Sequence, residues 1–303
     1  MKTLTTEFQA EIKAAVSLAR AANVATVITK DNVYQEGNAS IAPLLDRMAG
    51  SLMLPGSGVD GMENLEGLLA KAESGKSCLL LLDHYSNLDL TIFSLLVRRA
   101  GGRGEDIANA LIAIAGAKLN EDNPVVAAFA SAYTRIVIYP SGYLKGLPPD
   151  VKEAEIARSL SINRAAMKAL EERKSRGKLV LVFPAGTRYR PWDPGTKKGV
   201  REIDSYVRSF DYMCCVALNG EILQVDRSEM MNDVVSRDVV RVTAGPVRSC
   251  AEFREKARAG AEAAGGRDRK QAVVDAIMAE LDLLHAEAEE KRKPLARHGG
   301  AAG

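Results

Sequence analysis

The sequence lacks any apolar run near the ~18 residues that a membrane-spanning helix requires. Its N-terminal segment, MKTLTTEFQAEIKAAVSLAR, is interrupted by charged residues and so lacks the apolar core of a secretory signal peptide. We therefore expect a cytoplasmic protein. Basic clusters such as Arg98, Arg99 and Arg103 give it a means of weak contact with the inner face of a membrane.

A large excess of one charge is also absent. The 303 residues include 41 Lys and Arg against 39 Asp and Glu, and a net charge of +2 does not favour a nucleic-acid partner. The four cysteines, Cys78, Cys214, Cys215 and Cys250, contain no CxxC pair of the kind that binds zinc. The first three lie in apolar runs, where free cysteine packs as a small hydrophobe in a reducing compartment. We expect no metal and no cofactor.

What the sequence does contain is a series of short apolar runs that alternate with longer amphipathic stretches. Hydrophobic residues make up 47% of the chain, enough for a sizeable core. Runs rich in Leu, Val and Ile suit strands buried on both faces, and the alternation favours an α/β fold with a mainly parallel mixed sheet flanked by helices. The runs are residues 77–82, 110–115, 135–139, 178–183, 213–218 and 238–243. We expect a smaller N-terminal helical domain over 1–70, an α/β domain over 71–290 and a disordered tail over 291–303.

The first candidate site follows the first of these runs, in LLLLDHYSNLDL, where His84 and Asp89 are five positions apart. Ligands of open α/β sheets gather beyond the carboxyl ends of strands. Ser86 can cap a following helix, which places Asp89 in its first turn. A carboxylate there can bind one imidazole nitrogen and leave the other free as a base. Taken alone, the pair is better explained by a surface histidine and an acidic residue that complements the helix dipole.

The second candidate site follows the run 178–183, in PAGTRYRPWDPGTKKG. Gly186 lets backbone amides approach a ligand closely, and Gly186 and Thr187 are candidates for oxyanion or loop support. Arg188 and Arg190 are two positions apart, so in extended backbone they project to the same side and can bind one phosphate. The alternative is a solvated basic loop. Trp192 either lines the mouth of an acyl channel or anchors the loop.

Together the two sites resemble the blocks of the glycerolipid acyltransferase superfamily, which carries HxxxxD followed by a block like FPEGTRSR. His84–Asp89 and the segment 183–190, FPAGTRYR, occur in that order. The chain is most similar to the soluble, plastid-type glycerol-3-phosphate acyltransferases, over most of residues 60–220. The resemblance implies that His84 is a general base oriented by Asp89, and that Arg188 and Arg190 bind the phosphate of the acceptor.

The activity implied by the resemblance is transfer of a fatty acyl group from acyl-ACP or acyl-CoA to glycerol 3-phosphate, the first step of phospholipid synthesis. Lysophosphatidate is the alternative acceptor. A non-catalytic phosphate- or phospholipid-binding module is the alternative of another class. No GxSxG motif is present, which agrees with direct transfer.

Two departures from the family pattern concern the acceptor. Ala185 stands where the family usually has Glu, although the plastid type lacks it too. The basic pair that follows the third strand of the plastid type is replaced by Tyr-Pro-Ser-Gly at 139–142. We expect Arg135, or Lys145 from the loop, to supply the missing charge.

Overall fold

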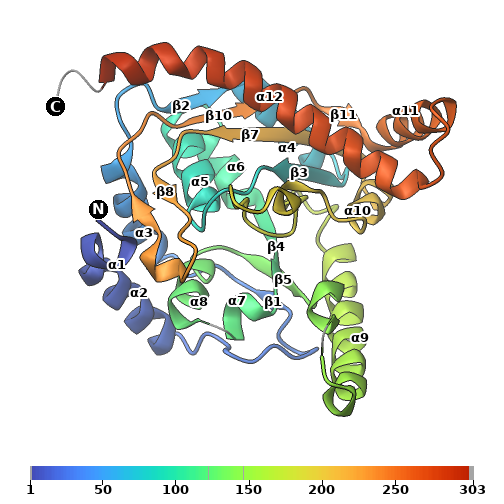
Figure 1. Cartoon of the computed structure of the whole chain (residues 1–303), viewed down its shortest axis with the longest axis horizontal. Helices are drawn as coiled ribbons and strands as arrows, with labels where there is room; N and C mark the ends of the chain where they lie inside the picture. Colours follow the sequence, from blue (N-terminus) through green and yellow to red (C-terminus); the bar gives the residue numbers. More distant parts are fainter. Residues whose placement is uncertain (1, 122, 146, 300–303) are drawn as a thin grey trace.

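The computed structural model describes residues 2–121, 123–145 and 147–299 (Figure 1). Within them, a nine-stranded mixed sheet has the order β1-β5-β4-β6-β3-β7-β10-β2, and β11 pairs with β7. The strands are β1 (Tyr34–Gln35), β2 (Gly58–Asp60), β3 (Cys78–Leu82), β4 (Leu111–Gly116), β5 (Arg135–Ile138), β6 (Leu179–Val182), β7 (Tyr212–Asn219), β10 (Arg241–Ala244) and β11 (Arg248–Ser249). A separate two-stranded sheet pairs β8 (Leu223–Gln224) with β9 (Val234–Val235).

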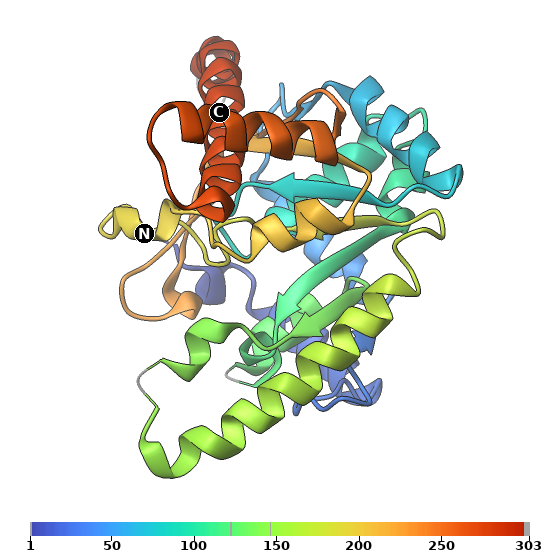
Figure 2. The ribbon, with the colours of Figure 1, turned by 90° about the vertical axis from the view of Figure 1, so that its right-hand side faces the viewer.

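Helices cover both faces of the large sheet (Figures 1 and 2). They are α1 (Leu4–Glu7), α2 (Gln9–Ala21), α3 (Ala42–Leu52), α4 (Met62–Glu73), α5 (Asp89–Arg99), α6 (Gly104–Ala110), α7 (Lys118–Glu121), α8 (Pro124–Ala130), α9 (Pro149–Glu171), α10 (Ile203–Ser209), α11 (Cys250–Ala263) and α12 (Arg269–Gly299). Short 3-10 helices are η1 (Ser141–Leu144), η2 (Pro194–Lys197) and η3 (Met230–Asn232).

The predicted fold class is confirmed. Each of the six apolar runs overlaps a strand, and β5, β4, β6, β3 and β7 are parallel neighbours. Alternate residues of β3 point to opposite faces: Leu80 and Leu82 join the apolar cluster under α2–α6, whereas Leu79 and Leu81 join the cluster under α9, α10 and α12. A strand with helices on both sides needs apolar residues at every position, which is why these runs are continuous.

Both ends of the chain contribute regular structure, although the sequence pattern predicts a separate N-terminal helical domain and a disordered C-terminal tail. Helices α1–α4 lie within the first 73 residues, but β1 and β2 also come from this part and form opposite edges of the sheet. The expected disordered tail, 291–303, begins inside α12, which continues to Gly299, while residues 300–303 lie outside the described residues. Among the described residues, no helix is long and apolar enough to cross a bilayer.

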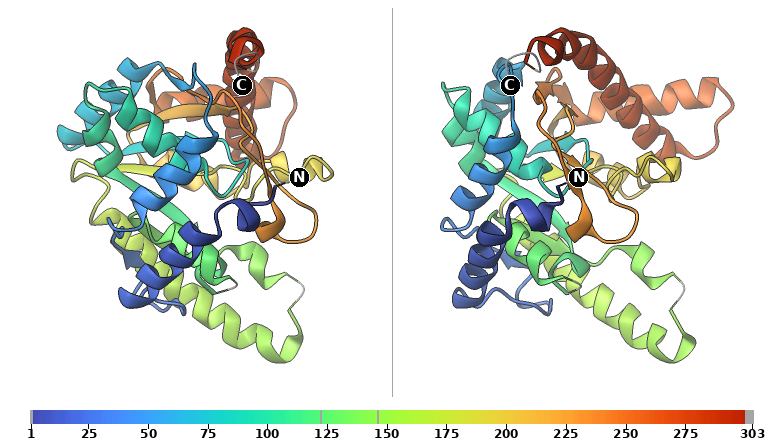
Figure 3. Two further views of the ribbon diagram at one scale, coloured as in Figure 1. Left: turned by 90° about the vertical axis from the view of Figure 1, so that its left-hand side faces the viewer. Right: turned by 60° about the vertical axis from the view of Figure 1, so that its left-hand side comes forward.

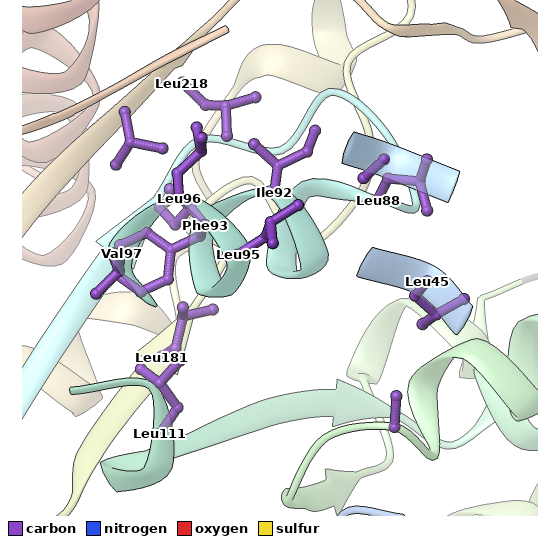
Figure 4. Packing of buried hydrophobic residues seen from close by; sticks show 14 of the residues in the cluster. Leu45, Leu88, Ile92, Phe93, Leu95, Leu96, Val97, Leu111, Leu181 and Leu218 are labelled. Carbon is purple, nitrogen blue, oxygen red and sulfur yellow. The ribbon is translucent and has the colours of Figure 1, made fainter. Parts of the chain in front are cut away.

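Helix α5 positions Asp89, the last residue of the first candidate site. Ile92, Phe93 and Leu96 are buried in one apolar cluster that also contains Leu88, Leu45 of α3 and Leu218 of β7 (Figure 4). Each large apolar side chain of this kind contributes roughly 1.5–3 kcal/mol when it is fully removed from water. Since Asp89 is the first residue of α5, this packing holds its carboxylate in place relative to β3.

Candidate active site

Asp89 is a buried carboxylate that closes the loop between β3 and α5. Its side chain is fully buried and accepts hydrogen bonds from His84 Nδ1 (2.9 Å), Tyr85 N (2.6 Å), Ser86 N (2.9 Å) and Ser86 Oγ (2.7 Å). Several donors of this kind compensate a carboxylate for lost water. Ser86 does not cap α5 as expected: its hydroxyl donates to Asp89 and accepts from Leu88 N at 3.1 Å, because the Asp89 carboxylate is the stronger acceptor.

The bond to Asp89 determines the tautomer of His84. Asp89 accepts at Nδ1, so the imidazole carries its proton there and presents Nε2 as a base. Nε2 has no hydrogen-bond partner among residues 2–121, 123–145 and 147–299. The ring stacks on Phe183, with centroids 4.0 Å apart, and 18% of the side chain is exposed. The imidazole of His84 is thus held in a fixed orientation, with an unpaired and accessible Nε2.

The two candidate sites meet at the carboxyl edge of the sheet. β3 and β6 are parallel neighbours, so the loops that follow them leave at the same edge. The backbone N–H of Tyr189 donates to the carbonyl oxygen of His84 at 2.8 Å. Two motifs roughly a hundred positions apart are therefore hydrogen-bonded to each other directly.

Gly186 forms the turn that opens the arginine block. Its φ of +67° is in the left-handed region, and an added Cβ would lie 3.3 Å from Val200 Cγ1. Its amide donates to the Phe183 carbonyl at 3.0 Å, so it does not face a ligand. The amide of Thr187 has no acceptor in the described part of the chain. Of the two expected oxyanion donors, Thr187 is the one whose N–H is free.

Arg188 lies next to the site but its guanidinium has a protein partner. Nη1 donates to Oδ2 of Asp233 at 2.7 Å, and the Asp233 side chain is fully buried. The other Asp233 oxygen accepts from Asp226 N at 2.9 Å. Burial raises the pKa of the Asp233 carboxyl even though Arg188 opposes this. The ion pair therefore ties the block to residues 226–233.

Arg190 is the arginine of the block whose charge has no partner in the described part of the chain. It starts a tight turn in which Asp193 N donates to its carbonyl at 2.9 Å, and its own N–H donates to Thr196 Oγ1 at 2.9 Å. Its guanidinium has no hydrogen-bond or ion-pair partner among the described residues. The side chain is partly exposed and available to an anion.

The structure does not bring Arg135 to this site. β5 is separated from β3 by β4 and β6, so three strand spacings place it about 14 Å away. The Arg135 side chain is 2% exposed and donates to the carbonyl of Ala130 and to Gln35, because a buried guanidinium requires acceptors. Lys145 is exposed at the end of η1, in the loop after the same distant strand.

A small pocket beside His84 is lined in part by residues that the sequence did not single out. Helix α12 lies over β7 (Figure 1) and contributes Met278 and Leu281 to this pocket, together with Asp83 and Tyr85, which flank His84. His285 of α12 lies 3.3 Å from Tyr85 Oη and 3.8 Å from Asp83 Oδ2. In the sequence, the sign of the contact with His285 is that two polar residues, Asp83 and Tyr85, flank His84.

A comparison with known families matches the part of the chain that carries these residues. The family model described as Acyltransferase matches residues 58–234, more than half of the chain. The matched span contains the loop after β3 and the arginine block, and ends one residue after Asp233. No curated protein matches the chain.

Proposed function

This chain belongs to the acyltransferase family, and on that basis we propose that it transfers a fatty acyl group from acyl-ACP or acyl-CoA to glycerol 3-phosphate. The observation that carries the proposal is the Asp89–His84 pair, which presents a free imidazole nitrogen in a loop that is hydrogen-bonded to the arginine block, where Arg190 is unpaired among the described residues. A base next to an anion-binding side chain is the arrangement needed to activate a hydroxyl on a phosphorylated acceptor.

In the proposed reaction, Nε2 of His84 takes the proton of the acceptor hydroxyl as its oxygen attacks the thioester carbonyl. A C–O bond forms, the C–S bond breaks, and the departing thiolate takes the proton back from His84. Asp89 stabilises the imidazolium between these steps through the 2.9 Å bond at Nδ1. The N–H of Thr187 is our candidate for the oxyanion that develops on the carbonyl.

The acceptor's phosphate is assigned to Arg190, with Arg188 beside it. Asp233 occupies one of the N–H groups of Arg188, and the remaining donors can still reach a phosphate oxygen. Because the Arg188–Asp233 ion pair is neutral as a unit, Arg190 contributes more than Arg188 to the electrostatic attraction of the phosphate. Binding of the phosphate places the acceptor hydroxyl next to His84, so that the reaction takes place between bound and oriented groups rather than through a chance collision.

Lysophosphatidate is the second candidate acceptor. It is favoured by the Arg188–Asp233 pair, because a site with little free positive charge binds a small dianion weakly, whereas a lysolipid bears the same phosphate and also an acyl chain that the protein can bind. Glycerol 3-phosphate is favoured because it reaches the site by diffusion, whereas extracting a lysolipid from a bilayer exposes its chain at ~0.8 kcal/mol per CH₂. Steady-state kinetics with both acceptors and one donor decides between them. A higher kcat/KM for lysophosphatidate would reverse our choice. Phosphate binding without any thiol release would instead indicate a non-catalytic module.

Weak contact with a membrane surface is part of the proposal, since the product is a lipid. Helix α9 exposes Ile156, Leu160 and Met167, at 38%, 64% and 43%, along one side of the helix, with Arg164 and Lys168 near them. Exposed apolar residues beside basic ones suit the surface of an anionic bilayer at the cytoplasmic face. Cosedimentation with anionic liposomes at low salt, lost in Leu160→Glu, is the expected result. Equal binding by both proteins would exclude α9 as the contact.

A further inference from the structure

The charge balance around the arginine block leaves a phosphate with too few cationic partners. A phosphomonoester carries about two negative charges near neutral pH. Arg188 is neutralised by Asp233, and Arg190 contributes one positive charge. Lys197 is paired with Asp282 at 2.5 Å, and Lys198, at the end of η2, is exposed and unpaired among the described residues. A dianion bound here would need a second unpaired cation close to Arg190.

Arg227 lies against the turn that carries Arg190. Its guanidinium carbon is 5.3 Å from the centroid of the Trp192 ring, within the range of a cation–π contact. Trp192 belongs to the turn between Arg190 and Asp193. Arg227 is exposed, and no carboxylate among the described residues forms an ion pair with it. Asp193 caps Gly195 N and Asp226 caps Ser228 N, so each of these carboxylates is engaged elsewhere.

The position of Arg227 is determined by the buried Asp233. One oxygen of this carboxylate binds Arg188 and the other accepts from Asp226 N, the residue before Arg227. The segment is also held by the N-terminus, where Leu4 N donates to the Asp233 carbonyl at 2.8 Å and Thr5 Oγ1 donates to Met231 O at 2.7 Å. Figure 3 shows this orange segment next to α1. Arg227 is therefore presented by a fixed segment.

We infer that Arg190 and Arg227 together bind a phosphate group, and that Trp192 holds Arg227 in position for this. The inference rests on the proposed function and adds a residue and a charge to it. Two guanidiniums that face one phosphate neutralise it and offer two sets of paired donors. The phosphate belongs either to the acceptor or to the CoA or phosphopantetheine arm of the donor, and kinetics separates these sources.

The test compares Arg227→Gln, Arg190→Gln and the double variant with Arg237→Gln, an arginine that follows this segment and is exposed and unpaired in the described part of the chain. If the acceptor phosphate is bound, Arg227→Gln raises the KM for glycerol 3-phosphate at least about tenfold, and the donor KM changes little. The double variant loses less than the product of the two single losses, because both arginines bind one ligand. Trp192→Leu also raises the KM for glycerol 3-phosphate. Trp192→Phe, which keeps an aromatic face, raises this KM less than Trp192→Leu does.

A rise in the donor KM alone would still support a two-arginine phosphate site and would assign it to the donor. Kinetics for Arg227→Gln that match those of Arg237→Gln would overturn the inference while leaving the proposed activity of the wild type intact. A tenfold loss in Lys198→Gln, another unpaired cation of the block, with none in Arg227→Gln would overturn it as well. If the wild type acylates neither acceptor, the proposed function fails. Calorimetric titration with inorganic phosphate then decides the inference, since weaker binding by Arg227→Gln than by Arg237→Gln supports it and equal binding overturns it.

Discussion

The backbone N–H of Tyr189 donates to the carbonyl oxygen of His84 at 2.8 Å, so the loop that carries His84 and the loop that carries the arginines form one unit. Tyr189 lies between Arg188 and Arg190, and His84 is the residue whose imidazole Asp89 orients. A displacement of either loop therefore changes the distance between His84, the proposed base, and the arginines proposed to bind phosphate. The predictions below follow from this coupling.

Replacing Asp89 with Asn should reduce kcat by about 10²- to 10⁴-fold, the range of a general acid–base contribution. The amide oxygen cannot accept all the bonds that the carboxylate receives from His84, Tyr85 and Ser86, and the amide nitrogen cannot accept from His84 Nδ1. Steady-state kinetics measures the loss, and circular dichroism checks that the fold persists. Wild-type turnover in a folded Asp89→Asn protein would contradict the assigned tautomer of His84.

The Arg188–Asp233 pair should behave mainly as a structural contact. Arg188→Gln leaves a buried carboxylate without its cation, and we expect the free energy of unfolding to fall by about 1–3 kcal/mol in urea denaturation. The double variant Arg188→Gln/Asp233→Asn removes the uncompensated charge and should recover part of this loss. If Arg188→Gln changed only the acceptor KM and not the stability, Arg188 would be a phosphate ligand before it is a structural residue.

Gly186 and Gly177 form a matched pair, with φ of +67° and +69°. Alanine at either position costs roughly 1–2 kcal/mol of left-handed strain. Gly177 has open space around a new Cβ and lies before β6, away from the site, whereas Gly186 meets Val200 and precedes Thr187 and Tyr189. Both alanine variants should lose similar stability, but only Gly186→Ala should lose kcat. Equal kcat in the two variants would show that the turn does not position the site.

Asp83 predicts a pH dependence of stability. Burial raises the pKa of the Asp83 carboxyl, although His285 faces it at 3.8 Å. A carboxyl whose pKa is higher in the folded chain than in the unfolded chain disfavours folding once it ionises. Its stabilising contribution is therefore present below the ordinary pKa of ~3.9 and is lost as the pH rises through the folded value.

Because Asn does not ionise, Asp83→Asn should gain stability relative to the wild type between pH 4 and the folded pKa of Asp83, and keep that gain at higher pH. Urea denaturation of both proteins across this range measures the difference. A difference that stays constant with pH, or that moves toward the wild type, would contradict the direction of the shift.

The parts of this structure that sequence predicts are those set by local pattern. His84 and Asp89 are five positions apart at a strand end, so their contact depends on one loop and one helix start. The continuous apolar runs predict the parallel strands because burial on both faces leaves a one-dimensional signal. Neither conclusion requires knowledge of distant pairings.

The remaining features depend on contacts between distant segments. Arg135 occupies a strand start, but only the strand order shows that β5 is remote from β3. The partner of Arg188 is Asp233, 45 positions later in a segment without clear periodicity, so spacing alone predicted a free guanidinium. His285 approaches Tyr85 from 200 positions away on the last helix. The path of the chain, which no local pattern encodes, decides these three cases.

The central claim, that His84 activates a hydroxyl of a phosphorylated acceptor for direct attack on a thioester, is tested by thiol release from acyl-CoA or acyl-ACP. The measurement is made on the wild type and His84→Ala, each with and without glycerol 3-phosphate. We predict acceptor-dependent thiol release by the wild type, matched by formation of the acylated product. For folded His84→Ala we predict a rate at least about 10²-fold lower. Acceptor-dependent release at the wild-type rate by folded His84→Ala would contradict the claim.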